Sequence, residues 1–130
     1  MREVRVEEME ERLHAALEQV DVELERRFGD RYNLHPARPP HGEAAKRQYD
    51  GLFEVTAGFS AGFGSEYGAG YALALRVVTL DQVPQAEREA FEAEAVGLLE
   101  RQLKLLFPER KLEIVRDVHG LKIIGDLKLA

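Results

Sequence analysis

The sequence contains no cysteine, which excludes disulfides and the thiolate zinc sites of many small domains. No apolar run approaches the ~20 residues that a membrane-spanning helix needs, so we expect no membrane partner. The first residues, MREVRVEEMEER, lack the apolar centre of a secretory signal. These absences together lead us to expect a cytoplasmic protein.

Positive charge is also scarce, because 18 Lys and Arg stand against 24 Asp and Glu, for a net charge of −6. Nucleic-acid binding depends on neutralising phosphates, so this balance argues against a nucleic-acid partner. A hydrophobic content of 45% with 32% charged residues is ordinary for a folded protein. A chain of 130 residues is long enough to bury a core, and we expect one domain over residues 1–130.

The most informative segment, residues 52–80, alternates between bulky and nearly bare positions. The bulky positions are Phe53, Val55, Ala57, Phe59, Ala61, Phe63, Tyr71, Leu73, Leu75 and Val77. The bare ones are Gly58, Ser60, Gly62, Gly64, Gly68, Gly70, Ala72 and Ala74. Because side chains alternate across a strand, this pattern predicts a β-hairpin that buries one face and leaves the other almost without side chains.

The register of this hairpin follows from matching its faces. A turn at residues 65–67 sets Phe59 opposite Leu73 and Val55 opposite Val77. A slip of one residue would move every side chain to the opposite face of the strand. Registers that mix the bulky and bare faces should therefore be unfavourable.

Two helices are predicted from apolar spacing. The first runs from Val6 to Phe28, with its stop at Gly29, since glycine accepts the left-handed cap conformation. The second runs from Pro84 to Phe107, with Asp81 as a nearby cap and Pro108 enforcing the end.

A second hairpin is predicted at the C-terminus, from Leu112 to Val118 and from Leu121 to Leu129, turning at residues 119–120. This register pairs Val118 with Leu121 and Val115 with Ile124. One face is then apolar, with the members Leu112, Ile114, Val118, Ile123 and Leu127, interrupted by Arg116.

The order α-β-β-α-β-β predicts an α+β fold, a two-layer sandwich in which a four-stranded antiparallel sheet carries both helices on one face. The bulky faces of both hairpins would meet the helices. The bare strip would then lie on the outer face, with Glu54, Thr56 and Arg76 closing one end as a solvated ion pair.

The bare strip is the leading candidate site, with the interface residues Gly58, Ser60, Gly62, Gly70, Ala72 and Ala74. Rows of small residues let another backbone or sheet approach closely, and an uncharged patch is typical of an interface. The alternative is a strongly twisted sheet with a solvated outer surface. We expect a non-enzymatic protein that acts by protein association, as a homodimer or with another protein.

The segment 31–48 is basic, with Arg31, Arg38, Lys46 and Arg47 against Glu43 alone, whereas residues 1–28 carry nine acids against five arginines. Arginine forks suit carboxylates and phosphates. The alternative function is therefore a binding module for a small anionic ligand, or a chaperone-like adaptor for another protein. The segment could equally dock on the acidic first helix.

The sequence shows no catalytic constellation, and we expect no cofactor. His35 and His41, with Glu43 or Asp50, lack any recognised metal-ligand spacing, so no metal is expected. An enzymatic alternative would place a site between residues 31–51 and the sheet. Gln102 and Arg116 interrupt apolar faces; they either bond each other or a backbone carbonyl, or line a pocket between the second helix and the sheet, or the face assignment is wrong.

Overall fold

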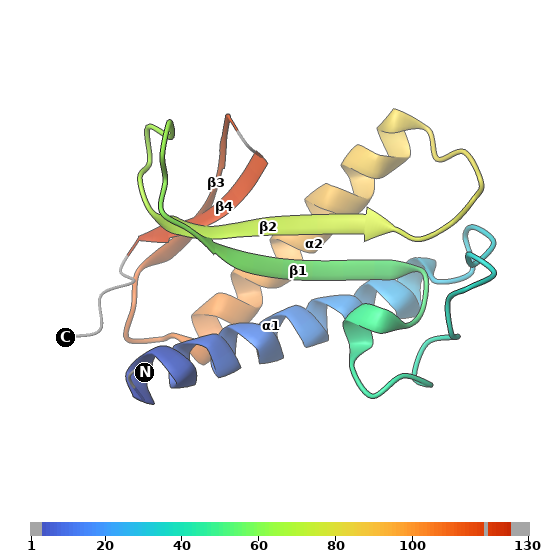
Figure 1. The fold of residues 1–130 in the computed structure, drawn as a ribbon, viewed down its shortest axis with the longest axis horizontal. Coiled ribbons are helices and arrows are strands. Elements are labelled where there is room, and N and C mark those ends of the chain that lie inside the picture. The colour runs from blue at the N-terminus through green and yellow to red at the C-terminus, as the bar shows by residue number, and fades with distance from the viewer. Residues whose placement is uncertain (1–3, 119, 126–130) are drawn as a thin grey trace.

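The protein is described by a computed structural model over residues 4–118 and 120–125. Its elements are the helix α1 (Val4–Phe28), the short helix η1 (Arg47–Tyr49), the strands β1 (Phe53–Ser60) and β2 (Gly70–Val77), the helix α2 (Gln85–Leu106), and the strands β3 (Leu112–Asp117) and β4 (Gly120–Gly125). The order α-β-β-α-β-β confirms the predicted α+β fold (Figure 1).

All four strands form one antiparallel sheet in the order β1-β2-β4-β3. The two hairpins therefore meet through β2 and β4, and the contact is short: Tyr71 pairs with Ile123 and Ala72 with Lys122. Beyond these pairs β3 and β4 turn away from β2 (Figure 1). The sheet is consequently split along part of its length.

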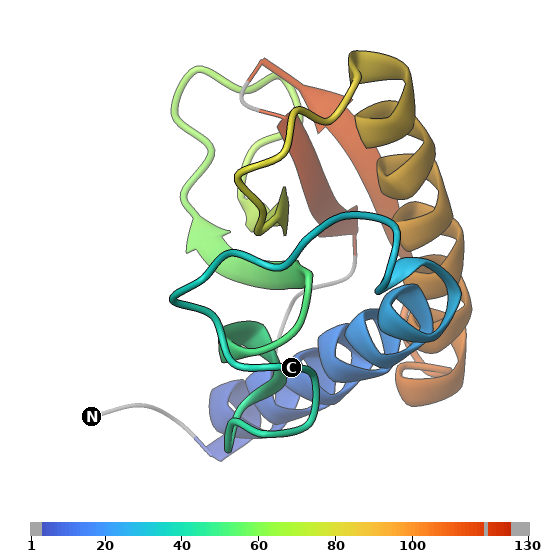
Figure 2. The ribbon, with the colours of Figure 1, turned by 90° about the vertical axis from the view of Figure 1, so that its right-hand side faces the viewer.

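Both helices lie on one side of the sheet and enclose the core (Figure 2). The apolar stripe predicted for α1 is buried at Met9, Leu13, Ala16, Leu17, Val20 and Leu24. Phe91 of α2 stands at the centre, where its ring lies 5.2 Å from that of Phe28 and 5.3 Å from that of Phe53. Full burial of a leucine, valine or methionine side chain contributes roughly 1.5–3 kcal/mol, so the apolar stripe of α1 holds this helix against the rest of the core. In the described part of the chain, neither helix is long and apolar enough to cross a membrane.

The helix α1 ends where it was predicted to end, but for a different physical reason. Gly29 does not adopt a positive φ; its N–H donates to the Glu25 carbonyl at 2.9 Å. A Cβ at this position would overlap the backbone carbonyl and the carboxylate of Glu25. Glycine is required here for space, not for a left-handed conformation.

The start of α2 also differs. Pro84 is the N-cap residue before α2 and not part of its first turn as predicted, and no side chain caps the helix. Asp81 instead accepts a hydrogen bond from the Asn33 N–H at 2.8 Å, and so ties the segment after α1 to the segment before α2.

The predicted register of the first hairpin is wrong by two residues. The ladder pairs Phe53 with Val77 and Phe59 with Tyr71, and it ends where Ser60 meets Gly70. Ala61 and Phe63 belong to a loop, because Gly62 turns the chain with a φ of +87°. A shift of two residues keeps every side chain on its predicted side of the sheet, although the partners differ. The predicted burial of the bulky face is wrong at Phe59, which is 68% exposed.

The second hairpin shows the same kind of error. Asp117 pairs with Gly120 and Val115 with Lys122, so the turn lies one residue earlier than predicted. Val118 is therefore in the turn and 74% exposed, and it does not join the apolar face. Residue 119 and Leu127 lie outside the described residues.

Candidate functional site

The six interface residues predicted from the bare strip divide into two groups. Gly58, Ala72 and Ala74 are exposed on the outer face of β1 and β2, with Ser60 half-buried beside them. Gly62 and Gly70, by contrast, are covered by the protein's own chain. We call the exposed residues Gly58, Ala72 and Ala74 the open strip.

Gly70 is small because Lys122 crosses over it. A Cβ at Gly70 would overlap the Ile123 carbonyl oxygen and the aliphatic carbons of the Lys122 side chain. A Cβ at Gly62 would similarly overlap the backbone of Gly68 and Ala69. Internal packing therefore accounts for Gly62 and Gly70, whereas it does not account for Gly58 of the open strip.

The covering element is the loop 61–69, which folds over the outer face of β4 and β3. Lys122 and Asp117 form an ion pair beneath it at 2.9 Å, each with a side chain only 2% exposed. The Lys122 ammonium also donates to the Gly68 carbonyl at 2.8 Å and to Ser65 Oγ at 3.0 Å, while Ser65 Oγ donates to Asp117 at 2.7 Å. The loop is thus held against the sheet by a buried charge pair.

The same loop, which joins β1 to β2 at the Ser60–Gly70 end of the hairpin, carries two exposed aromatic side chains. Phe63 is 88% exposed and Tyr67 is 41% exposed. At the opposite end Glu54 and Arg76 pair across β1 and β2 at 3.4 Å, as the sequence predicted. The open strip therefore lies between the loop that carries these aromatic residues and the Glu54–Arg76 ion pair.

The structure does not gather the predicted anion-binding residues at one point. Arg31 pairs with Glu87 of α2 at 2.9 Å, whereas Lys46 lies beside the acidic residues of α1. The Arg38 guanidinium is directed inward and donates to four backbone carbonyls, those of Gln48, Asp50, Gly51 and Phe53. The side chain of Arg47 is outside the described residues. Arg38 is thus the organising centre of the segment 31–51.

A cluster of titratable residues between α1 and this segment was missed from the sequence. Ligand atoms of Asp21, Glu25 and His41 lie within 4.8 Å of one another, and His41 Nδ1 is 3.5 Å from the buried Asp50. His35 is not part of the cluster: its Nδ1 accepts from the Ala37 N–H. The spacing of Asp21 and Glu25, four residues apart on a helix, was the available signal.

Glu25 has a structural task within that cluster. Its carboxylate accepts a hydrogen bond from the Phe53 N–H at 2.9 Å, at the start of β1. Burial raises the pKa of the Glu25 carboxyl, and the backbone donors and His41 offset part of that effect. A Cβ at Gly51 would overlap this carboxylate, so Gly51 leaves the space that Glu25 occupies.

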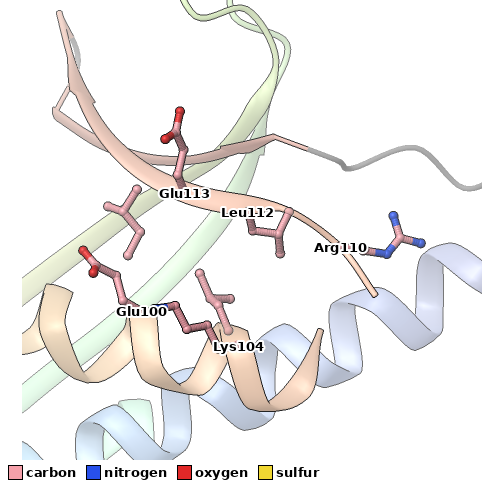
Figure 3. A pocket seen from close by; sticks show the side chains of 7 residues that line it. Glu100, Lys104, Arg110, Leu112 and Glu113 are labelled. Atoms are coloured by element: carbon pink, nitrogen blue, oxygen red, sulfur yellow. The ribbon is translucent and has the colours of Figure 1, made fainter. Parts of the chain in front are cut away.

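Two hollows lie against α2. One, of about 280 Å³, lies between the end of α2 and β3, where Glu100 and Lys104 face Leu112 (Figure 3). The other, of about 240 Å³, lies between α2 and the sheet and includes Arg116 in its lining. The prediction that Gln102 and Arg116 line a pocket here therefore applies to Arg116 alone. Gln102 is half-buried elsewhere on α2, and Arg116 pairs with Glu92 instead.

The fold and these surfaces define an α+β protein of order α-β-β-α-β-β. A family model described as an uncharacterised protein matches residues 4–125, and the chain belongs to that family. A protein of Borreliella burgdorferi, described as an uncharacterized protein, is 40% identical over 106 residues, which cover 82% of this chain and 83% of the relative. No solved structure matches the chain at a significant level.

Proposed function

We propose that this protein acts by associating with another protein chain, in the first place a second copy of itself, through the open strip. The observation that carries the proposal is the exposure of Gly58, Ala72 and Ala74 on a sheet face. Among the described residues, apart from the two chain neighbours of Gly58, no heavy atom lies within 4 Å of a Cβ built at this glycine. A glycine within a strand costs roughly 0.5–1 kcal/mol relative to alanine, so an open glycine there indicates close approach from outside.

The surroundings of the open strip support an interface between two copies. Aromatic residues are enriched in interfaces relative to the rest of a protein surface, and charge is depleted from the interface core. Phe63 and Tyr67 are exposed in the loop at one end of the strip, and the Glu54–Arg76 pair at the other end offers both signs of charge. In a twofold arrangement the same patch faces itself, so Arg76 of one copy can meet Glu54 of the other.

The test is the solution mass, measured by size-exclusion chromatography with light scattering over a range of protein concentrations. We expect the native chain to show twice its 14.7 kDa mass. Gly58→Glu should yield a folded monomer, since a carboxylate would enter the interface. Gly97→Glu is the matched control, because a Cβ there also meets nothing within 4 Å but lies on α2.

Two outcomes would refute the proposal. One is a native chain that is monomeric at every concentration, and the other is a Gly58→Glu variant that keeps the mass of the native dimer. We also propose a cytoplasmic location; the lack of cysteine supports it, because such a chain does not depend on an oxidising compartment.

A further inference from the structure

A cavity opens where the two hairpins separate. β4 pairs with β2 at Tyr71 and Ala72. Among the described residues, only β1 pairs with the remainder of β2, Leu73–Val77. β3 and β4 diverge from β2 at this point, and α2 passes beside the wedge that results (Figure 1). The wedge contains the cavity of about 240 Å³.

The lining of this cavity is largely apolar. The apolar side chains include Val55, Leu73, Leu75, Val96, Leu99 and Leu121. Ligand sites are typically apolar clefts with a few placed polar groups. At ~30 Å³ per water molecule, the volume corresponds to about eight waters, which suits a ligand of about eight to ten non-hydrogen atoms.

Two charged residues complete the lining. Arg116 lies on the helix-facing side of β3, where its guanidinium pairs with Glu92 of α2. The Arg116 side chain is 60% exposed and that of Glu92 is 34% exposed. A guanidinium has five N–H donors in a planar fork, and the contact with Glu92 runs through Nη2. Arg116 therefore retains donors for a second carboxylate, while Glu92 has its charge countered.

We infer that this cavity binds a small apolar monocarboxylate, with its hydrocarbon part among the leucines and its carboxylate on Arg116. The inference combines two features, an apolar space within the wedge and an arginine fork in its lining. It goes beyond the proposed association, because the cavity lies between α2 and the sheet and shares only Ala74 with the open strip, whose Gly58 and Ala72 do not line it. Either can fail without the other.

The first experiment is a titration of the isotope-labelled full chain followed by amide chemical shifts in NMR. Hexanoate is the probe; acetate carries the head group alone, and hexylamine carries the tail with the opposite charge. We expect saturable shifts at Leu73, Leu99 and Leu121 with hexanoate. Equal binding of hexylamine would overturn the inference, as would saturable shifts at the same amides with acetate or their absence with hexanoate.

Variants then separate the two features. Arg116→Gln should weaken hexanoate binding about tenfold or more, as expected for the loss of a charge-assisted hydrogen bond. Arg26→Gln is the matched control, because Arg26 is similarly exposed at 64% and also pairs with a glutamate, Glu23, but lies on α1 outside the cavity lining; the affinity of this variant should equal that of the native chain. Val96→Phe should fill the cavity and abolish binding in a folded protein. Unchanged affinity in Arg116→Gln or in Val96→Phe would overturn the inference.

Discussion

The ammonium of Lys122 lies 2.9 Å from the carboxylate of Asp117, and both side chains are 2% exposed. The pair is inside the protein because the loop 61–69 closes over it and supplies Ser65 and the Gly68 carbonyl as further partners. Burying two charges is costly, and only mutual pairing with additional hydrogen bonds offsets that cost. The position of the aromatic loop beside the open strip thus depends on one ion pair.

The ion pair predicts an asymmetry between single and double variants. Lys122→Met should lower the free energy of unfolding by about 3–5 kcal/mol, because it leaves the buried Asp117 without its counter-charge. The double variant Lys122→Met with Asp117→Leu should recover much of that loss. Denaturant titration measures both, with Lys104→Met on the exposed side of α2 as a control. A double variant no more stable than the single one would contradict this account.

Two glycines of the same hairpin should respond oppositely to alanine. Gly58→Ala should stabilise the protein by about 0.5–1 kcal/mol as a monomer, since the new Cβ meets open space and backbone entropy is reduced. Gly70→Ala should destabilise it, since the Cβ would overlap the Ile123 carbonyl. Thermal unfolding at low protein concentration compares them. Equal changes in thermal stability for Gly58→Ala and Gly70→Ala would show that strand propensity, not local packing, determines the stability of both variants.

The guanidinium of Arg38 should be indispensable to the segment 31–51. Arg38→Lys keeps the charge but cannot reproduce a planar fork that serves four carbonyls. We expect a loss of about 3 kcal/mol, because buried carbonyls are left without donors. Hydrogen exchange should show the loss of protection at Gly51, whose N–H donates to Pro39. Arg76→Lys, on the exposed outer face, should be neutral.

The buried carboxyl of Glu25 predicts a particular pH dependence. Because its pKa is raised in the folded state, the folded chain holds the Glu25 proton more tightly than the unfolded chain. Its contribution is therefore favourable below the unfolded value of 4.5 and is lost as pH rises through the folded pKa.

Glu25→Gln isolates this contribution, since the amide oxygen can still accept from the Phe53 N–H. The unfolding free energy of the variant relative to the native chain should increase as pH rises from below 4.5 toward neutrality. Paired denaturant titrations at several pH values measure it. A difference that stays constant across this range would contradict a raised pKa.

The hydrophobic pattern alone predicted the helices, the hairpins and the face of each strand residue. Alternation has a period of two, so it separates the faces of Phe59 and Ser60 but cannot tell whether Phe59 meets Leu73 or Tyr71. Both hairpins were accordingly predicted two residues away from their true register. The turns determine that choice, through Gly62 in one case and Gly120 in the other, each with a positive φ.

The candidate sites also fall into those that local spacing could predict and those that it could not. The small residues of the open strip were visible in the sequence, because strand alternation places them on the outer face; alternation did not show that Gly70, on the same face, is covered by Lys122. The burial of Lys122, the inward direction of Arg38 and the cluster around Glu25 were not visible, because each joins residues far apart in the chain: Lys122 with Ser65, Arg38 with Phe53, and Glu25 with Phe53. Hydrogen bonds of this kind leave no periodic signal.

The sequence by itself determined the α+β order and the sidedness of its strands, since local spacing dictates which side chains share a face. Only the tertiary structure decided the strand order β1-β2-β4-β3 and the two-residue contact between the hairpins. Because that contact is so short, a wedge remains open beside α2, and the loop 61–69 folds over the sheet. The physical reason is that strand pairing between hairpins and the burial of a charge pair depend on contacts between residues far apart in the sequence. Such contacts compete with one another only once the chain has collapsed.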